Sequence, residues 1–380
     1  MERPQYHAVG KVYERKDGIA KVTGQETYAS DLVLPRMLIG RILRSPFPHV
    51  RVKNIDTKAV EKIGAVCITF KDIPKKTYCE RLVNIPKATY KDRRILTDHP
   101  AHVGEAIAAV AAETEDLAEK ALSLIRVEYE KLPAVLDPEE AIKPGAPLIH
   151  ESILVGDEER KIENNIAVRK LITQGDIEKG FEEADVIIED EFRTGRVYHA
   201  QMETKTVVCQ PEADGGITVW TTTQTIHNVR QLLGDLFGIP LSKVSVRRIV
   251  VGGSFGSSIQ MNSATPVGVA LALKARRPVK LALTREEDMY DHVKYPSRIR
   301  LRLGAKKDGI LVAGQMKVIV DIGAHNTQAY SLMGCMAGWG SPFTDCLISI
   351  MRGRLSIRTK CRLVPCRVLE IPRSTSQWNR

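Results

Sequence analysis

The chain has 380 residues, of which 43% are hydrophobic and 27% are charged, a balance that is ordinary for a soluble globular protein of two or three domains. No apolar run is long enough to cross a bilayer, and the N-terminus lacks the apolar core of a secretory signal. These features exclude a membrane-spanning protein and predict a cytoplasmic location.

The net charge of +10 is unevenly distributed. Residues 347–380 contain eight basic residues and one acidic residue, which leaves only +3 for residues 1–346. The body of the chain has no basic stripe that could follow a phosphate backbone. We therefore expect no nucleic-acid partner, although charge alone would suggest one.

The seven cysteines are scattered, and none forms a CxxC pair. The histidines likewise form no pair at metal-binding spacing. These patterns predict reduced thiols and no zinc or iron–sulfur site.

The first expected domain follows from alternating and apolar runs. Residues 38–44 alternate as a strand, and residues 105–112 form a short apolar run typical of a buried strand. Thr114 is suited to cap the helix that follows, and residues 127–129 return as a strand. This strand–helix–strand pattern predicts an α+β domain able to fold by itself without a cofactor.

Residues 136–170 are rich in Pro, Glu and Lys and are interpreted as a linker. Beyond them we expect a helix over 226–237, because apolar residues recur there at helical spacing and Gly238 follows. The expected strands of this second region are 184–192, 216–222, 244–251, 279–283, 298–304 and 310–320.

The strand at 244–251 runs into residues 252–258, Gly-Gly-Ser-Phe-Gly-Ser-Ser, here called the glycine turn. Closely spaced glycines after a strand let backbone N–H groups approach an anion or an oxo group without obstruction by Cβ atoms. The spacing is not that of a dinucleotide fingerprint, and no Gly-Lys-Ser/Thr ends the turn as a phosphate loop would require. The glycine turn is therefore a candidate binding site of another kind.

Several motifs occur in a fixed order along residues 10–340. They are Lys21-Val22-Thr23-Gly24, Val103-Gly104-Glu105, Val127-Glu128-Tyr129, Gly175-Asp176, His199 with Glu203, Trp220 to Gln224, the glycine turn, Thr284-Arg285-Glu286-Glu287 and Asp321-Ile322-Gly323-Ala324. The ordered set resembles the molybdopterin-binding large subunit of the xanthine dehydrogenase and aldehyde oxidase family.

The resemblance implies an α+β fold. It predicts a hammerhead-like α/β domain over 10–135, the linker over 136–170 and the first part of the molybdenum-cofactor-binding domain over 171–345. The segment 346–380 has no counterpart in the family.

The resemblance also implies a function, the oxidative hydroxylation of an aldehyde or an N-heteroaromatic with water as the oxygen source. The implied cofactor is molybdenum–molybdopterin, and its cytosine dinucleotide form is one option. Electrons would leave through an iron–sulfur subunit and an FAD subunit. The substrate is expected to be a small molecule.

The same resemblance assigns cofactor contacts. Gly253, Phe255 and Gly256 match residues that lie against the molybdenum ligands, and Gln224 matches an amide placed near an oxo ligand. Ile259 stands where purine-oxidising members have a glutamate, so we expect poor purine oxidation.

Three other residues draw attention. Glu203 is interpreted as a support behind the site, with a structural glutamate as the equal alternative. His227 is interpreted as a surface or capping residue, and Glu105 as structural.

From about residue 345 the resemblance ends, and residues 346–380 are basic without a helical or strand period. A shifted reading frame from Ser356 would encode a segment close to the family's, so we interpret the tail as frameshifted, a naturally evolved tail being the alternative. The tail is then expected to be disordered and to leave Val318, Val320 and Leu332 uncovered.

No catalytic residue is expected in the chain as written, because the family's general-base glutamate belongs to a later segment. The chain should then be inactive and bind the cofactor poorly. The alternative function is a non-enzymatic remnant or scaffold that keeps only its partner-binding surfaces.

Overall fold

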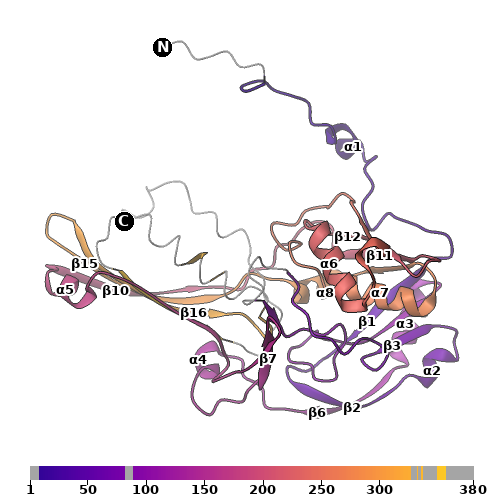
Figure 1. The fold of residues 1–380 in the computed structure, drawn as a ribbon, viewed down its shortest axis with the longest axis horizontal. Coiled ribbons are helices and arrows are strands. Elements are labelled where there is room, and N and C mark those ends of the chain that lie inside the picture. Colours follow the sequence, from indigo (N-terminus) through magenta and orange to yellow (C-terminus); the bar gives the residue numbers. More distant parts are fainter. Residues whose placement is uncertain (1–7, 82–88, 327–331, 333–334, 337–348, 357–380) are drawn as a thin grey trace.

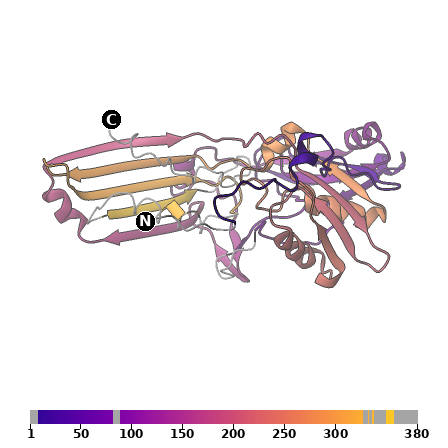
Figure 2. The same cartoon turned by 90° about the horizontal axis from the view of Figure 1, so that it is seen from above.

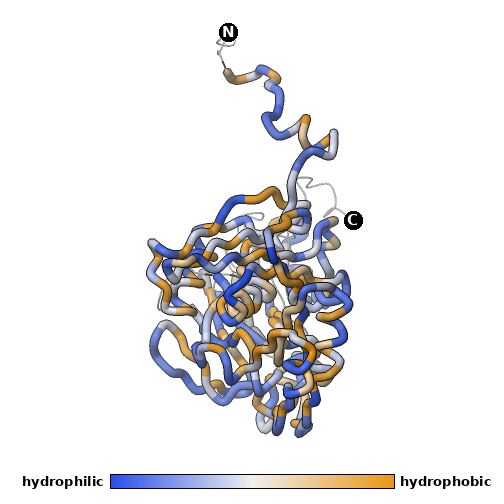
Figure 3. The backbone as a smooth tube through the Cα atoms, turned by 90° about the vertical axis from the view of Figure 1, so that its right-hand side faces the viewer, coloured by the Kyte–Doolittle hydropathy of each residue, from blue (hydrophilic) through white to orange (hydrophobic). Residues whose placement is uncertain are grey.

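The computed structural model describes residues 8–81, 89–326, 332, 335–336 and 349–356. A seven-stranded sheet with its helices forms one end of the molecule, and a long five-stranded sheet projects from it (Figures 1 and 2). Residues 8–22, which include α1, lie away from this body (Figures 1 and 3). None of the helices in the described residues is long and apolar enough to cross a membrane.

The described helices are α1 (Gly18–Val22), α2 (Lys58–Glu61), α3 (Glu115–Ser123), α4 (Pro138–Ala141), α5 (Ile177–Glu182), α6 (Ile226–Phe237), α7 (Ala264–Ala275), α8 (Arg285–Asp291) and the 3-10 helix η2 (Leu241–Lys243). The described strands are β1 (Leu38–Arg44), β2 (Val50–Asp56), β3 (Val66–Thr69), β4 (Tyr90–Lys91), β5 (Ala106–Ala112), β6 (Arg126–Lys131), β7 (Ser152–Val155), β8 (Glu158–Lys161), β9 (Ile166–Gln174), β10 (Val186–Thr194), β11 (Thr206–Pro211), β12 (Ile217–Thr221), β13 (Val244–Arg247), β14 (Val279–Ala282), β15 (Ser297–Ala305), β16 (Leu311–Asp321) and β17 (Ser349–Ser356).

The seven-stranded sheet has the order β13-β12-β11-β14-β1-β5-β3. Strand β1 pairs in parallel with β14, with Leu38 opposite Val279, so strands from both expected domains share one sheet. Their side chains also share one core, in which Ile42 and Ala109 are buried together with Leu271. The N-terminal domain therefore shares this core with the second domain and has only a smaller core, the one that includes α3, to itself.

Strand β5 shows why a run of small apolar residues occurs in this sheet. Every residue of β5 is buried. Ala109 and Ala111 belong to the core that includes α7, whereas Ala108 and Val110 belong to the core that includes α3. A strand covered by helices on both faces has no polar side, which explains the continuous apolar sequence.

Helix α3 confirms the expected cap, because the Thr114 side chain accepts a hydrogen bond from the backbone N–H of Leu117. The strand after it, β6, is also present. It pairs with β2 in a separate two-stranded sheet and not with β5, so the local elements were predicted correctly and their pairing was not specified by them.

Residues 136–170 are a folded segment and not an extended linker. They contain α4, β7, β8 and the start of β9, and Ile149 and Ile153 are buried in a second core. Asn165 is fully buried, and its amide donates hydrogen bonds to the carbonyl oxygens of Ala141 and Pro147. Among the residues that suggested a linker, Pro138 is buried in the first turn of α4, and the charged residues Glu158–Lys161 form the exposed strand β8.

The five-stranded sheet has the order β10-β15-β16-β17-β9. The hairpin β15–β16 confirms the strands expected over 298–304 and 310–320, and Gly309 in its turn has a φ of +89°. Strand β17 pairs in parallel with β16 and antiparallel with β9. The expectation that the tail lacks order is therefore wrong for residues 349–356, while 346–348 and 357–380 lie outside the described residues.

Residues 349–356 can form a strand without an apolar period because pairing uses backbone groups. The exposed N–H and C=O groups of a neighbouring strand can pair with any extended segment. Val318 and Val320 are each 1% exposed, so they are not the uncovered surface that was expected, and Leu332 packs against the same core. Among the side chains of this sheet whose burial is described, exposed apolar ones occur on β9 and β10 and include Leu171, Ile187, Ile188 and Phe192.

Candidate functional site

The glycine turn follows β13 and bends through left-handed backbone conformations. Gly253 and Gly256 have φ values of +103° and +96°, and Phe255 between them has +52°. A non-glycine residue in this region costs on the order of 1–3 kcal/mol and persists only where the surroundings impose it. The strained Phe255 is 48% exposed, so its ring is presented to solvent and is not a core side chain.

Gln224 is held directly against this turn. The Ser254 hydroxyl donates to Gln224 Oε1 at 2.6 Å and accepts from the backbone N–H of Ser258 at 3.0 Å. The backbone N–H of Gln224 donates to the carbonyl of Ser258 at 2.9 Å. The structure thus brings together the four residues that the sequence singled out, Gln224, Gly253, Phe255 and Gly256.

Ser254 is a residue whose role sequence reasoning missed, because in the sequence it is only a departure from the family's usual glycine. Its hydroxyl donates a hydrogen bond to Gln224 Oε1, so this oxygen already has a partner. The exposed Gln224 side chain therefore has its two amide hydrogens to offer a ligand.

Glu203 lies behind the turn. Its Oε2 accepts from the backbone N–H of Gly252 at 2.7 Å, and its own backbone N–H donates to the carbonyl of Gly252 at 3.1 Å. A Cβ on Gly252 would lie 2.6 Å from the Glu203 Cβ. Burial raises the pKa of Glu203, and the hydrogen bond from Gly252 opposes that rise. These contacts agree with the supporting role expected of Glu203.

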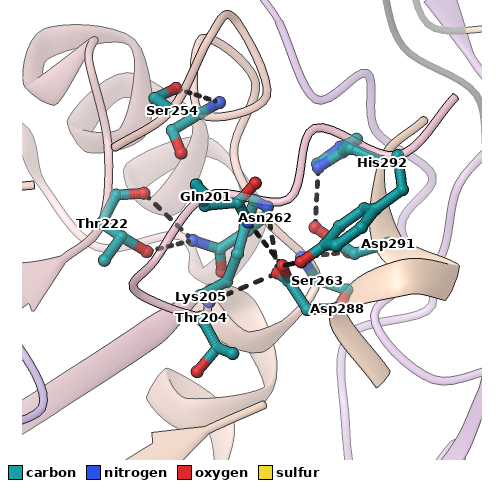
Figure 4. A network of polar contacts seen from close by, with 12 residues as sticks. Gln201, Thr204, Lys205, Thr222, Ser254, Asn262, Ser263, Asp288, Asp291 and His292 are labelled. Carbon is teal, nitrogen blue, oxygen red and sulfur yellow. Dashed lines mark hydrogen bonds and ion pairs between the residues drawn. The ribbon is translucent and has the colours of Figure 1, made fainter. Parts of the chain in front are cut away.

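A buried ion pair fixes the loop that carries Glu203 (Figure 4). Lys205 Nζ lies 3.0 Å from Asp288 Oδ1, and both side chains are at most 1% exposed. Gln201 Nε2 donates to Asp288 Oδ2 at 2.5 Å, and the Tyr198 hydroxyl also bonds to this carboxylate. Because the members come from separate segments of the chain, no local sequence pattern could have indicated the network.

The N-terminus of helix α8, which supplies Asp288, does carry a local sequence signal. Thr284 and Glu287 form a reciprocal capping box at its N-terminus. Close by, Asn262 Nδ2 donates to the Thr222 carbonyl at 3.3 Å, and Asn262 Oδ1 accepts from the backbone N–H of Thr265 at 3.0 Å (Figure 4). The end of β12 and the start of α7 are thereby joined beneath the turn.

Two further predicted residues lie at the margin of the site. His227 is exposed near the start of α6, as expected for a surface residue. Ile259 is half-buried, and its carbonyl accepts from the Thr225 hydroxyl at 2.7 Å. The structure therefore fixes the backbone at Ile259 beside the Gln224 segment.

The comparisons with known proteins agree with this arrangement. A molybdopterin cofactor-binding domain matches residues 158–341, and an aldehyde oxidase and xanthine dehydrogenase a/b hammerhead domain matches residues 23–133. The chain is 38% identical over 317 residues to a probable xanthine dehydrogenase subunit of Bacillus subtilis strain 168, covering 82% of this chain and 40% of that protein.

It is also 31% identical over 325 residues to the nicotinate dehydrogenase large molybdopterin subunit of Eubacterium barkeri, covering 84% of this chain and 72% of that protein. Among solved structures, the aldehyde oxidoreductase of Desulfovibrio gigas has a TM-score of 0.85 at 25% identity, covering 94% of this chain and 39% of that one. The chain spans less than half the length of the Bacillus subtilis relative and of this structure.

The chain thus joins an a/b hammerhead domain to a molybdopterin cofactor-binding domain. The chain belongs to the xanthine dehydrogenase and aldehyde oxidase family of molybdopterin-binding proteins.

Proposed function

We propose that the glycine turn and Gln224 form part of the molybdenum–molybdopterin site of a molybdenum hydroxylase large subunit. One observation carries the proposal. The Ser254 hydroxyl locks an exposed Gln224 amide beside a strained, exposed Phe255. Strain and exposure together are costly for stability alone and are typical of binding sites.

The residues present fit such a cofactor. Side chains are missing at Gly252 and Gly253, where a Cβ would meet Glu203 and Gln201 at 2.6 and 3.2 Å. Glycine at these positions therefore lets the turn pack closely on Glu203 and Gln201, which holds the turn in place beside Gln224. Gln224 supplies amide hydrogens for an oxo oxygen, and the Phe255 ring supplies an apolar wall that excludes water from a planar substrate.

When bound, the cofactor supplies the two-electron redox chemistry of a hydroxylation that takes its oxygen from water. The chain's own residues position the reactants. Glu203 fixes Gly252, and Ser254 fixes both ends of the turn against Gln224. A preorganised donor of this kind stabilises developing negative charge without reorganising during the reaction.

The substrate class is proposed to be an aldehyde or an N-heteroaromatic. Ile259 offers no hydrogen-bonding side chain where purine-oxidising members have a glutamate. The names of the relatives cover xanthine, nicotinate and aldehydes, so they leave room for this choice.

The electron-transfer partners are proposed to be an iron–sulfur subunit and an FAD subunit. The names of several relatives describe one part of a larger enzyme, such as a large molybdopterin subunit, a molybdenum-binding subunit and a large chain. A large subunit that binds only the molybdenum cofactor needs such partners to remove its electrons.

The test is chemical identification of what the chain binds. The chain is purified from a bacterial host that makes the cofactor, oxidised in acid and analysed for the fluorescent pterin and for released CMP. The sequence alone predicts poor cofactor binding, but the turn held against Gln224 leads us to expect bound pterin. Equal amounts of pterin and CMP would establish the cytosine dinucleotide form. Pterin without CMP would refute the dinucleotide form, and neither compound would refute the proposed function.

A further inference from the structure

A second polar cluster, largely buried, lies where three distant segments meet. Asp92 follows β4, His150 precedes β7 and His325 follows β16. One ligand atom from each of these residues lies within 4.8 Å of the others. The sequence did not indicate this cluster, because its members are brought together only by the tertiary fold.

His325 is the centre of the cluster. Its Nε2 lies 2.8 Å from Glu105 Oε1, which is a hydrogen bond. Its Nδ1 lies 3.8 Å from Asp92 Oδ1, which is too long for one, and this nitrogen is buried without a hydrogen-bond partner among the described residues. The two side chains are only 3% and 2% exposed. A buried nitrogen in this position costs free energy unless something fills the gap.

Each of the three residues has its other polar atom fixed by a neighbour. His325 Nε2 is held by Glu105, and His150 Nε2 lies 2.7 Å from the carbonyl oxygen of Ala324. Asp92 Oδ2 accepts from the backbone N–H of Asn326 at 2.5 Å. Each histidine that donates through Nε2 keeps an unprotonated Nδ1. Asp92, whose Oδ2 accepts from Asn326, likewise keeps Oδ1 available to ligate an ion.

This is the arrangement found around metal-ligating side chains. A ligating histidine nearly always donates its second ring N–H to a carboxylate or a backbone carbonyl, which sets its tautomer and orientation. Here Glu105 and Ala324 act as those two acceptors. Ligand atoms bound at about 2.0–2.2 Å in a tetrahedral site lie a little closer to each other than the observed separation of His325 Nδ1 and Asp92 Oδ1, so only a small closure is needed.

We infer that Asp92, His150 and His325 bind one divalent transition-metal ion of the zinc class. The donor set of two imidazoles and one carboxylate suits such an ion. Its two positive charges would balance the buried carboxylates of Asp92 and Glu105. The inference does not depend on the proposed molybdenum site.

A metal at this point would be a structural clamp. It would join the segment after β4, the segment before β7 and the end of β16, which pack around a common core. Binding an ion to the folded state alone stabilises that state by mass action. Its removal should therefore loosen the junction between the five-stranded sheet and the rest of the molecule.

A competing set of ligands exists within the same cluster. His102, Glu105 and His325 also place one ligand atom each within 4.8 Å. In that set His325 would have to use Nε2, which is already bonded to Glu105, and His102 Nε2 lies 3.9 Å from Glu105 Oε2. The two sets share only His325, and His102 belongs to the competing set alone, so His102→Gln separates them.

The experiment uses the full chain, stripped with a chelator and titrated with Zn²⁺ and with Co²⁺. We expect one Zn²⁺ per chain, a rise in Tm on zinc addition, and a Co²⁺ absorption spectrum without a thiolate charge-transfer band. Asp92→Asn and His150→Gln should weaken binding at least about 100-fold, and Glu105→Gln by about 10- to 100-fold. His102→Gln and the exposed His227→Gln serve as matched controls and should bind like wild type.

Stoichiometric binding that survives in both Asp92→Asn and His150→Gln would overturn the inference, as would a thiolate band in the Co²⁺ spectrum. Loss of binding in His102→Gln alone would assign the ion to the competing set and contradict the one proposed. If the ligand variants fail to fold, the wild-type stoichiometry and the Co²⁺ spectrum decide, and the absence of one tight site in wild type refutes the inference.

Discussion

Single side chains hold the glycine turn in its conformation. The absence of a side chain at Gly252 leaves room for Glu203, and the hydroxyl of Ser254 holds Gln224. Gln224, Gly253, Phe255 and Gly256 could be predicted because a glycine turn after a strand is a local pattern. Ser254 could not, because a hydroxyl at that position shows its purpose only when its partner is seen.

Gly252→Ala should destabilise the turn. The added Cβ would lie 2.6 Å from that of Glu203, so the loop must shift. Overpacking of this kind costs about 1–3 kcal/mol in the free energy of unfolding, which urea denaturation measures. Gly195→Ala is the matched control, because nothing lies within 4 Å of its Cβ position and its φ is ordinary. Equal stability of the two variants would contradict this close packing of Gly252 on Glu203.

Ile259 should limit purine oxidation, and the test uses a gene in which the reading frame is shifted at Ser356, as our interpretation of the tail proposes. A purine edge left without a partner in a buried site costs on the order of 1–3 kcal/mol, or about 10- to 100-fold in kcat/KM. Ile259→Glu should recover that factor for xanthine and leave aldehyde oxidation little changed. Efficient xanthine turnover with Ile259 in place would show that the substrate assignment is wrong.

At the scale of elements, the sequence predicts individual helices and strands better than it predicts which strands pair. The sequence predicted α3 and α6 through apolar spacing and end signals, and the αL residue Gly238 ends α6 as expected. It could not predict that β1 joins β14, because strand pairing between distant segments leaves no local trace. The Lys205–Asp288 pair escaped detection for the same reason.

The loop before β11 should make stability sensitive to acid. Burial, together with the nearby His292 and Lys205, lowers the pKa of His199 from 6.5 to about 4. The folded state therefore binds a proton at His199 less readily than the unfolded state does. The contribution of His199 is present above pH 6.5 and is lost as pH falls toward 4.

Urea unfolding at a series of pH values between about 7.5 and about 4.5 measures this effect, because that window spans the shift of His199. His199→Gln removes the titrating group, so the free energy of unfolding should fall less steeply with decreasing pH than in wild type. Identical slopes for wild type and variant would show that His199 does not titrate with a lowered pKa.

At the scale of the whole molecule, the two family domains are joined by one sheet and one core. Residues 1–140 alone should therefore fail to form a stable core. In that fragment β1 lacks its partner β14, and the apolar residues of β5 lose the cover of α7. Amide hydrogen exchange should be fast at residues 38–44 in the fragment and slow in the full chain. Equal protection in both would show that the first domain folds independently.

Molybdenum content tests most directly whether the glycine turn, with Gln224 held against it by Ser254, binds the cofactor. The chain and its variants are purified from a host that makes the cofactor, and molybdenum per chain is measured by mass spectrometry. Wild type and the exposed control His227→Gln should retain equal amounts, whereas Gln224→Ala and Ser254→Val, which remove the amide or its brace, should retain several-fold less at unchanged circular dichroism. Full molybdenum retention in both site variants, or no molybdenum above background in wild type, would contradict the account.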